Sequence, residues 1–257
     1  MGSRLSPVHV SRCMRNVLVL SLWFGFVGCG APVAKQPSAP KAAETRPGPD
    51  VEGFLRAERI RGLVFKGKEA VPAVTSALSD QNHQVRQAAI ETLGQLGPAA
   101  ATSVPDLLPF LDNDAYRPLV IKSLARMGPD PVPALVAGLR HENPRIRSGA
   151  AESLGELGPS ASSAAEPLVK TLADSDPGVR RASATALGRT GKRDASIVAA
   201  LEKVLTDDDQ DARFRAAEAL ASLGSGQEPA IAVLVGNLKH ENDEVRARAA
   251  AALGRMG

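Results

Sequence analysis

Two His-Glu pairs are the residues whose types and spacing could do chemistry. His141-Glu142 and His240-Glu241 each place an imidazole beside a carboxylate. Both groups are ligands that iron and other transition metals accept in proteins. A site that combined the two pairs could therefore hold iron, and whether they combine depends on the elements that carry them.

Other catalytic groups are scarce in this chain. Cys13 and Cys29 both lie near the N-terminus, so we expect no thiol nucleophile, structural disulfide or cysteine-based metal site in the remainder. The run Asp207-Asp208-Asp209 offers oxygen ligands, but it lacks the spacing of an EF-hand loop. It is interpreted as a solvated turn, with weak calcium binding as the alternative. No glycine-rich phosphate loop follows a strand. We therefore expect no catalytic residue, no metal and no cofactor.

Composition and charge limit the class of partner. Aromatic residues are only 3% of the chain, which favours a thin core of closely approaching helices over a wide globular core. The formal charge of +3 arises in the first 28 residues, which hold Arg4, Arg12 and Arg15 and no acid. The remaining 28 basic residues balance the 28 acidic ones. A neutral chain gives no indication of nucleic-acid binding.

Three residue types recur along the chain at a fixed spacing. An arginine is followed seven residues later by leucine and eleven residues later by glycine. A fainter copy, Arg56/Leu63/Gly67, comes before six full copies. The full copies are Arg86/Leu93/Gly97, Arg117/Leu124/Gly128, Arg147/Leu154/Gly158, Arg180/Leu187/Gly191, Arg213/Leu220/Gly224 and Arg246/Leu253/Gly257.

Each copy predicts a pair of helices. In the first full copy the second helix is expected over 84–96, with Val85, Ala89 and Leu93 on one face. Gly97 should end this helix in the left-handed αL conformation. A proline, which suits a first helical turn, opens the first helix of most copies. These prolines are Pro72, Pro105, Pro133, Pro167 and Pro229.

These positions resemble HEAT repeats of the short class found in phycobilin lyase subunits and deoxyhypusine hydroxylase. Five of the six full copies also carry Asp or His six residues before the arginine, and the copy at Arg117 departs with a shorter turn. The resemblance covers 52–257 and implies an all-α solenoid, a HEAT/armadillo-like superhelix of about six full repeats after a degenerate one. It also implies a structural ladder of charge-assisted bonds between neighbouring repeats. The implied ladder residues are Asp80, Arg86, Arg117, Arg147, Asp174, Arg180, Asp207, Arg213 and Arg246.

The same resemblance raises an enzymatic alternative. Deoxyhypusine hydroxylase binds two irons through His-Glu pairs that directly follow the arginine, inside the second helix. Here those places hold residues such as Gln87-Ala88 and Ser148-Gly149, and the existing pairs lie in turns three repeats apart. At roughly 10 Å per repeat, that separation excludes a shared iron site. Because His141 and His240 stand six residues before the arginine, we expect them to replace the ladder aspartate. A HEAT-like oxidoreductase or phycobilin lyase-like subunit is the alternative function, although no residue set identifies a tetrapyrrole site.

The second helices should line the concave side of the solenoid. Positions five and nine after each arginine are polar with both signs, which suits a protein or peptide partner and suits a nucleic-acid backbone poorly. Ordinary solvated helix surface is the alternative. Phe214 is expected either to anchor a partner as an exposed aromatic or to pack on the neighbouring repeat. The candidate ridge is Glu91, Gln95, Lys122, Arg126, Glu152, Glu156, Arg189, Phe214, Glu218 and Arg255.

The N-terminus resembles a bacterial lipoprotein signal. A basic start precedes an apolar run over 17–27, and Gly28-Cys29 fits the cleavage site at which the cysteine receives a lipid. Phe26 stands where such signals usually have leucine. We expect a signal peptide over 1–28, lipidated Cys29 with a disordered Pro/Ala-rich tether over 29–50, and a repeat domain over 51–257. An ordinary cleaved signal and an uncleaved anchor are the alternatives.

The resemblance places such a chain on the outside of the bacterial membrane, in the periplasm or on the outer face. The C-terminal copy adds a second expected surface, because Ala249-Ala250-Ala251-Ala252-Leu253 precedes Gly257 without a polar capping repeat. We expect this edge to meet a partner or a second copy, unless the sequence continues. Charges at Ala249 and Leu253 should then prevent self-association and leave helicity intact. The sequence thus predicts a membrane-tethered protein–protein interaction scaffold without catalytic activity.

Overall fold

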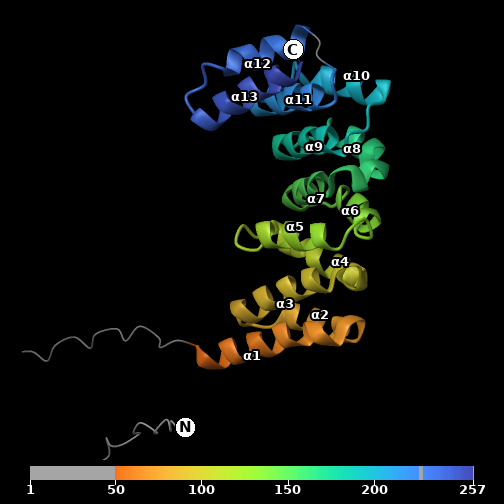
Figure 1. Ribbon diagram of the computed structural model, residues 1–257, viewed down its shortest axis with the longest axis vertical. Coiled ribbons are helices and arrows are strands. Elements are labelled where there is room, and N and C mark those ends of the chain that lie inside the picture. Colours follow the sequence, from red (N-terminus) through yellow and green to blue (C-terminus); the bar gives the residue numbers. More distant parts are fainter. Residues whose placement is uncertain (1–49, 226–227, 257) are drawn as a thin grey trace, which may run out of the picture. The chain divides into compact units, whose positions relative to one another are not determined.

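The computed structural model describes residues 50–225 and 228–256, and within these ranges the fold is all-α (Figure 1). The expected signal peptide over 1–28, the expected lipidation site Cys29 and the tether before Asp50 lie outside the described residues. No helix in the described part is both long enough and apolar enough to cross a membrane.

The α-helices differ in length between the two members of each repeat. The second helices mostly run for 14 residues, as α3 and α7 do, whereas the first helices are shorter. The α-helices are α1 Val51–Gly62, α2 Val71–Ser76, α3 His83–Leu96, α4 Val104–Leu107, α5 Arg117–Arg126, α6 Val132–Gly138, α7 Pro144–Leu157, α8 Ala165–Thr171, α9 Pro177–Thr190, α10 Ala195–Val204, α11 Gln210–Ser222, α12 Glu228–Asn237 and α13 Asp243–Met256. Short 3-10 helices join several of them, namely η1 Leu63–Ala70, η2 Ala77–Ser79, η3 Gly97–Ser103, η4 Leu108–Asp112 and η5 Gly158–Ala164.

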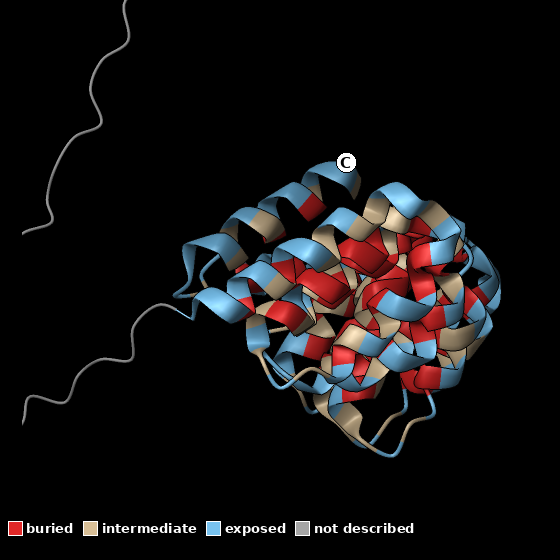
Figure 2. Cartoon of the chain, turned by 90° about the horizontal axis from the view of Figure 1, so that it is seen from below, coloured by how far each residue is buried: buried red, intermediate tan, exposed pale blue. Residues whose placement is uncertain are grey.

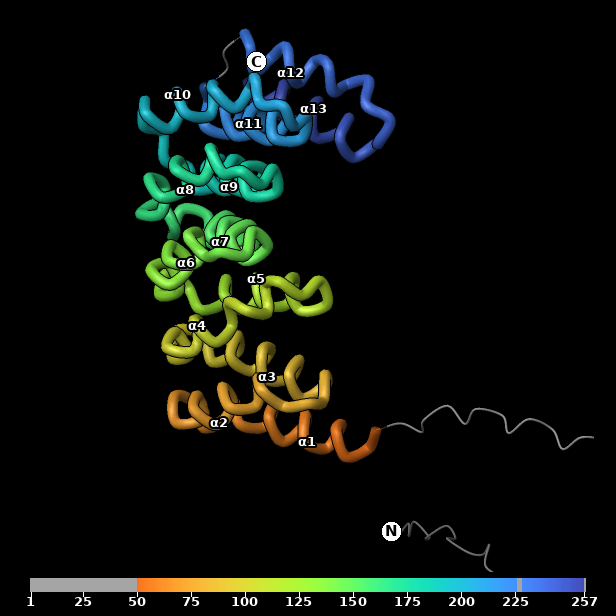
Figure 3. The backbone as a smooth tube through the Cα atoms, turned by 180° about the vertical axis from the view of Figure 1, so that it is seen from behind, coloured from red at the N-terminus to blue at the C-terminus, as the bar shows by residue number. Residues whose placement is uncertain are grey.

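The helices follow one another as pairs in a single stack (Figures 1 and 3). Helices α2, α4, α6, α8, α10 and α12 are the first members, and α3, α5, α7, α9, α11 and α13 are the second members. Helix α1 is the second helix of the degenerate copy. Each second helix contacts the next one, from α1 through to α13. The predicted all-α solenoid, with six full repeats after a degenerate one, is therefore confirmed.

Asn or Asp side chains begin most of the second helices. Asn82 Oδ1 accepts the backbone N–H of Gln84 at 2.8 Å at the start of α3. Such a cap satisfies an N–H group that has no partner inside the helix. The equivalent caps are Asn143 of α7, Asp176 of α9, Asp209 of α11 and Asn242 of α13. Helix α5 follows the shorter turn, has Tyr116 at this position without a side-chain cap, and runs for only 10 residues.

Glycine ends the second helices, but the expected αL conformation of Gly97 is wrong. Gly97 has φ 62° and ψ −138°, whereas Gly191 after α9 has φ 68° and ψ 3°, which is αL. The reason is that the chain enters the 3-10 helix η3 directly after α3. This abrupt change of direction needs a backbone conformation that only glycine adopts without a clash.

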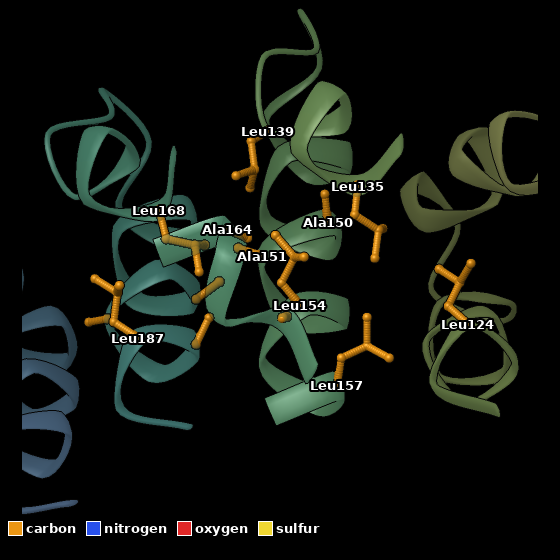
Figure 4. Close-up of a cluster of buried hydrophobic side chains, with 14 of the residues drawn as sticks. Leu124, Leu135, Leu139, Ala150, Ala151, Leu154, Leu157, Ala164, Leu168 and Leu187 are labelled. Carbon is orange, nitrogen blue, oxygen red and sulfur yellow. The ribbon is translucent and has the colours of Figure 1, made fainter. Parts of the chain in front are cut away.

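Buried residues lie along the inside of the stack (Figure 2), and leucine and alanine are the most frequent among them. Most belong to one large cluster, and a smaller one is formed by Ala57, Val85 and Ala88. Leu154 of α7 has no exposed surface, and Leu124 of α5 and Leu187 of α9 lie on either side of it (Figure 4). Each fully buried leucine stabilises the fold by about 1.5–3 kcal/mol relative to an exposed one. Because each leucine packs between repeats, the stack is held together by its nearest-neighbour contacts.

Small residues eight positions after the arginine bring neighbouring second helices close together. A Cβ atom added at Gly188 would lie 2.7 Å from Ala219 Cα, and one added at Gly155 would lie 3.1 Å from Ala186 Cα. The alanine-rich composition therefore serves close helix approach, as expected for a chain with few aromatic residues.

Candidate functional site

The arginine of each full repeat closes the turn before its own helix. Arg180 Nη1 donates to the carbonyl oxygen of Asp174, six residues earlier, at 2.9 Å. Arg147 makes the same bond to the carbonyl of His141 at 2.9 Å. The equivalent bonds join Arg86 to Asp80, Arg117 to Leu111, Arg213 to Asp207 and Arg246 to His240. These carbonyl groups of the turn thereby gain the hydrogen bonds that the helices do not supply.

Two of these arginines also bind the aspartate of the following repeat. Arg147 reaches the Asp174 carboxylate with Nε at 2.8 Å and Nη2 at 2.7 Å. Arg180 reaches Asp207 through the same two nitrogens, both at 2.7 Å. The hydrogen bonds from Arg180 lower the pKa of Asp207, although burial opposes this by raising it. These two-point pairs join α7 to the turn before α9, and α9 to the turn before α11.

The other arginines meet different partners. Arg56 of the degenerate copy reaches Asp80 through one nitrogen at 2.9 Å. Arg86 Nε donates to the Tyr116 hydroxyl at 3.0 Å, and its guanidinium lies over the same ring. Arg117 binds the Glu152 carboxylate of α7 at 2.8 and 2.9 Å. The ladder is thus continuous only where the next repeat carries an aspartate in its turn. Arg213, which faces a repeat with His240 there, bonds only to its own turn among the described residues.

His141 and His240 take over the turn-closing part of the aspartate's role. Their Nδ1 atoms accept the N–H group two residues further on at 3.0 and 3.1 Å, as Asp174 Oδ1 does at 2.9 Å. Each imidazole therefore uses one nitrogen inside its own turn. Among the described residues, no three His, Cys, Asp or Glu side chains lie close enough together to hold a metal ion.

The exposed side of α5, α7, α9, α11 and α13, called the second-helix face below, contains two adjoining hollows. The first hollow has a volume of about 540 Å³ and lies over α7, α9 and α11. Three arginines and three acidic residues line it, among them Glu152, Glu156, Arg181 and Arg189. Arg181 is held by the carboxylate of Asp209 at 2.5 and 2.7 Å. This hollow is polar and has no net formal charge.

The second hollow, called the arginine hollow below, has a volume of about 310 Å³ and lies over α9, α11 and α13. Four arginines line it together with two acidic residues, Glu218 and Glu244. Glu218 accepts hydrogen bonds from Arg248 Nε at 3.0 Å and from Arg215 Nη1 at 3.4 Å. Burial raises the pKa of Glu218, against the lowering effect of the nearby arginine charges. This hollow carries a formal charge of +2.

The candidate ridge residues divide between these hollows and the rest of the face. Glu152, Glu156 and Arg189 line the first hollow, whereas Arg189, Glu218 and Arg255 line the second. Glu91, Gln95, Lys122 and Arg126 line neither. Arg215 and Arg248, which stand two residues after the repeat arginine, also line the hollows and were not among the residues predicted from the sequence. The signal for them was present, because earlier copies hold small or apolar residues such as Ala88, Leu119 and Gly149 at this position.

The expectation that Phe214 forms an exposed anchor is wrong. Its side chain is only 3% exposed, and the guanidinium of Arg248 lies 5.4 Å from the ring centre. Arg248 belongs to α13 of the following repeat, so the ring packs between repeats. The alternative prediction, that Phe214 packs on the neighbouring repeat, is therefore confirmed. Phe214 therefore packs beneath Arg248, which lines the arginine hollow, and is almost completely shielded from solvent.

The expected C-terminal edge is also placed differently. Ala249 is fully buried and Leu253 is partly buried, so a charge at Ala249 would enter the core and the expectation of an intact fold is wrong. The exposed large apolar side chains of this end are Ile231 and Val235 of α12 and Leu238, which directly follows α12. They are 37%, 49% and 38% exposed.

Comparisons with known proteins agree with this architecture. The sequence family described as HEAT repeats matches over 55–119, 104–174 and 165–254. The chain belongs to the HEAT-repeat family. These matches span both helices of nearly every repeat, and the repeat arginines described above fall inside them. No curated protein sequence matches the chain.

Solved structures with a similar fold are distant in sequence. A designed armadillo repeat protein in complex with the peptide (KR)4 is 18% identical, with a TM-score of 0.44, covering 73% of this chain and 99% of that one. The CpcE–CpcF complex of phycocyanin lyase from Nostoc sp. PCC7120 is 22% identical, with a TM-score of 0.48, covering 59% of this chain and 98% of that one. YibA of Escherichia coli is 19% identical, with a TM-score of 0.49, covering 80% and 81%. These similarities concern the fold alone.

Proposed function

We propose that this HEAT-repeat chain is a binding scaffold without catalytic activity, which holds a protein or peptide partner on its second-helix face. The observation that carries the proposal is the pair of adjoining polar hollows over α7, α9, α11 and α13. They are open, and they present both signs of charge at close spacing. Such a surface suits a polypeptide that carries its own mixed charges.

The recurring polar residues have structural roles and the variable ones line the hollows, which supports a scaffold over an enzyme. The arginine that recurs in every full repeat closes its own turn, and the Asp or His of five of these repeats also closes the turn or joins it to the repeat before. The residues that differ from repeat to repeat line the hollows. A catalytic site needs a few groups held together for one reaction, whereas a binding face can use a varied row of side chains.

A bulky side chain in the shared wall of the hollows tests the binding face. Thr185 lines both hollows, so the larger side chain of Thr185→Trp should obstruct them. Capture of the partner from envelope extracts should then fall at least about tenfold, which corresponds to a loss of about 1.4 kcal/mol in binding free energy. Lys170→Trp, at an exposed position on the first helix α8, is the matched control and should leave capture unchanged. Equal capture by both variants would refute the proposed face.

Metal and activity measurements test the enzymatic alternative. Purified protein should contain only trace iron by elemental analysis, and His141→Gln should not change that content. Stoichiometric iron that His141→Gln removes would instead favour a HEAT-like oxidoreductase. Stable capture of a bilin pigment would favour a lyase-like subunit.

We also propose that the scaffold is exported and anchored by a lipid on Cys29, in the periplasm or on the outer face of the cell envelope. The support is the basic start, the apolar run over 17–27 and the small residue Gly28 before the cysteine. A single cysteine of this kind gives a clean test. Radiolabelled palmitate should be incorporated into the chain in bacterial cells, and Cys29→Ala should abolish it. Labelling that persists in Cys29→Ala would contradict the anchor.

Self-association through the edge at 249–253 stays a prediction, and we propose α12 as an additional surface for it. Ile231, Val235 and Leu238 recur at helical spacing and form one exposed apolar stripe. If a second copy covers this stripe, Val235→Glu should convert a dimer to a monomer in light scattering. Ala232→Glu, an exposed substitution beside the stripe, should leave the mass unchanged. A monomer in the unaltered protein would contradict the prediction.

A further inference from the structure

The arginine hollow differs from the rest of the second-helix face in its charge. The first hollow balances its three arginines with three acidic residues. The arginine hollow has four arginines and only two acidic residues. The chain outside the first 28 residues is neutral, so this excess is local and belongs to α9, α11 and α13.

Glu218, one of the two acidic residues that line the hollow, is already paired with arginines. Both oxygens of Glu218 receive the guanidinium of Arg248, and Arg215 also donates to one of them. Glu218 thus pairs with two of the four arginines, and its carboxylate already accepts three hydrogen bonds from them. Stacking of Arg248 on the buried ring of Phe214 fixes the same guanidinium from below.

The two outer arginines keep donors available. Arg255 makes no ion pair within the described residues, and Arg189 uses a single N–H on Glu156 in a pair that is about half exposed. A guanidinium has five N–H donors in a planar fork. The hydroxyls of Thr185 and Ser222 donate to their own helix backbones, so they add acceptors and no competing donor. Even with these acceptors and the carboxylate of Glu244, the four guanidinium groups that line the hollow leave N–H donors in excess.

We propose that the arginine hollow binds a carboxylate carried by an extended segment of the partner, either an Asp or Glu side chain or a chain-terminal carboxylate. This inference rests on the proposed binding function and names its chemistry. A carboxylate matches the planar fork of Arg189 or Arg255 with two parallel hydrogen bonds. A phosphate fits less well, because Glu218 and Glu244 face the same hollow and would repel a second negative charge.

The small residues under the hollow let a polypeptide backbone approach. Gly188 and Ala219 form its floor, and their helices are so close that a Cβ on Gly188 would lie 2.7 Å from Ala219 Cα. A volume of about 310 Å³ admits one or two side chains. The neighbouring neutral hollow then receives the adjacent residues of the same segment.

Titration of the purified full chain with capped peptides tests this inference. At low ionic strength, acetyl-hexaglutamate-amide should bind at least about tenfold more tightly than the hexaglutamine and hexalysine peptides, as one two-point arginine–carboxylate contact accounts for that ratio. A hexaglutamine peptide with a free C-terminus separates the two carboxylate sources, since it should gain affinity only if a chain end is bound. Tighter binding of the hexalysine peptide, or equal binding of all peptides, would overturn the carboxylate assignment.

Two charge-removing variants place the binding in the hollow. Arg255→Gln and Arg189→Gln should each reduce hexaglutamate affinity about three- to tenfold. Arg140→Gln, at an exposed position after α6 that lines neither hollow, should change it by less than about twofold by screened long-range charge alone. An equal loss in all three variants would show nonspecific attraction and overturn the site. A phosphoserine peptide that bound tenfold more tightly than hexaglutamate would overturn the choice of carboxylate.

The outcome separates this inference from the proposed function. If no peptide discriminates but Thr185→Trp still prevents capture of the envelope partner, the face is correct and its carboxylate chemistry is wrong. If Thr185→Trp leaves capture unchanged, the proposed face itself fails, whatever the charge preference of the hollow.

Discussion

The ion pair between Arg180 and Asp207 should contribute measurably to stability, unlike most salt bridges on protein surfaces. Asp207→Asn removes the charge and keeps an oxygen that can accept the N–H of Asp209, which Asp207 Oδ1 now accepts at 2.8 Å. The substitution therefore isolates the charge of the inter-repeat contact from the closure of the turn.

The magnitude follows from geometry and burial. Both bonds of the pair are 2.7 Å long, and the side chains are only 16% and 10% exposed. Charge-assisted bonds of this kind contribute about 1.5–3 kcal/mol, and removing one partner leaves the other charge poorly solvated. We expect Asp207→Asn to lower the free energy of unfolding by about 2 kcal/mol, and the coupling energy with Arg180→Gln to be about 1–2 kcal/mol.

The matched control is an inter-repeat pair with the same chemistry but little burial. Arg189 binds Glu156 with Nη1 at 2.9 Å, and both side chains are more than half exposed. Solvent screens such pairs, so Glu156→Gln should cost less than about 0.5–1 kcal/mol. Urea unfolding followed by circular dichroism measures both, with the slope of each transition checking that the unfolding remains comparable. A loss in Asp207→Asn no larger than in Glu156→Gln would refute the claim that the buried ion pair contributes measurably to stability.

Three further outcomes follow from the same contacts. Gly188→Ala should destabilise the chain by about 1–3 kcal/mol in urea unfolding, because the added Cβ would meet Ala219. Gly254→Ala, at the same repeat position but with nothing within 4 Å, should stabilise the chain by up to about 1 kcal/mol. The reverse order of stabilities would contradict the close approach of the helices. Because the folded pKa of Asp207 is lowered, its stabilisation is present above the unfolded pKa of about 3.9 and disappears as the pH falls below it. The melting temperature should therefore fall more steeply between pH 6 and pH 2 for the unaltered protein than for Asp207→Asn. Parallel curves of melting temperature against pH would exclude this linkage. Phe214→Ala should cost about 3–5 kcal/mol of stability in urea unfolding, since the ring is buried between repeats, and an unchanged unfolding midpoint would contradict that burial.

The architecture could be predicted because every repeat carries the same local physics. Leucines such as Leu154 recur at the period of the repeat, and a leucine at that place must be buried for two short helices to stay together. Prolines and glycines mark the beginnings and ends of the helices for reasons of backbone geometry that act within a few residues. The N-cap residues, such as Asn82, also act within a few residues, because their side chains accept N–H groups of the first helical turn.

The remaining differences come from contacts between repeats. The ψ angle of Gly97 depends on the 3-10 helix that follows, so the helix before it does not determine the cap. A helical wheel places Phe214 by its own helix alone, but Arg248 from the next repeat covers the ring. The arginine hollow likewise needs three helices at once. Its residues Arg215 and Arg248 share a repeat position, yet only the stacked arrangement places them around Glu218.

Photo-crosslinking from the second-helix face tests the central claim most directly. A photoreactive amino acid at Thr185 stands in the wall of both hollows, and one at Lys170 stands exposed on the first helix α8. Irradiation in the bacterial envelope, followed by mass spectrometry, should give a defined protein adduct from position 185 and none from position 170, and excess hexaglutamate peptide should reduce it. Adducts of equal yield from both positions, or a defined adduct from position 170 alone, would contradict the account.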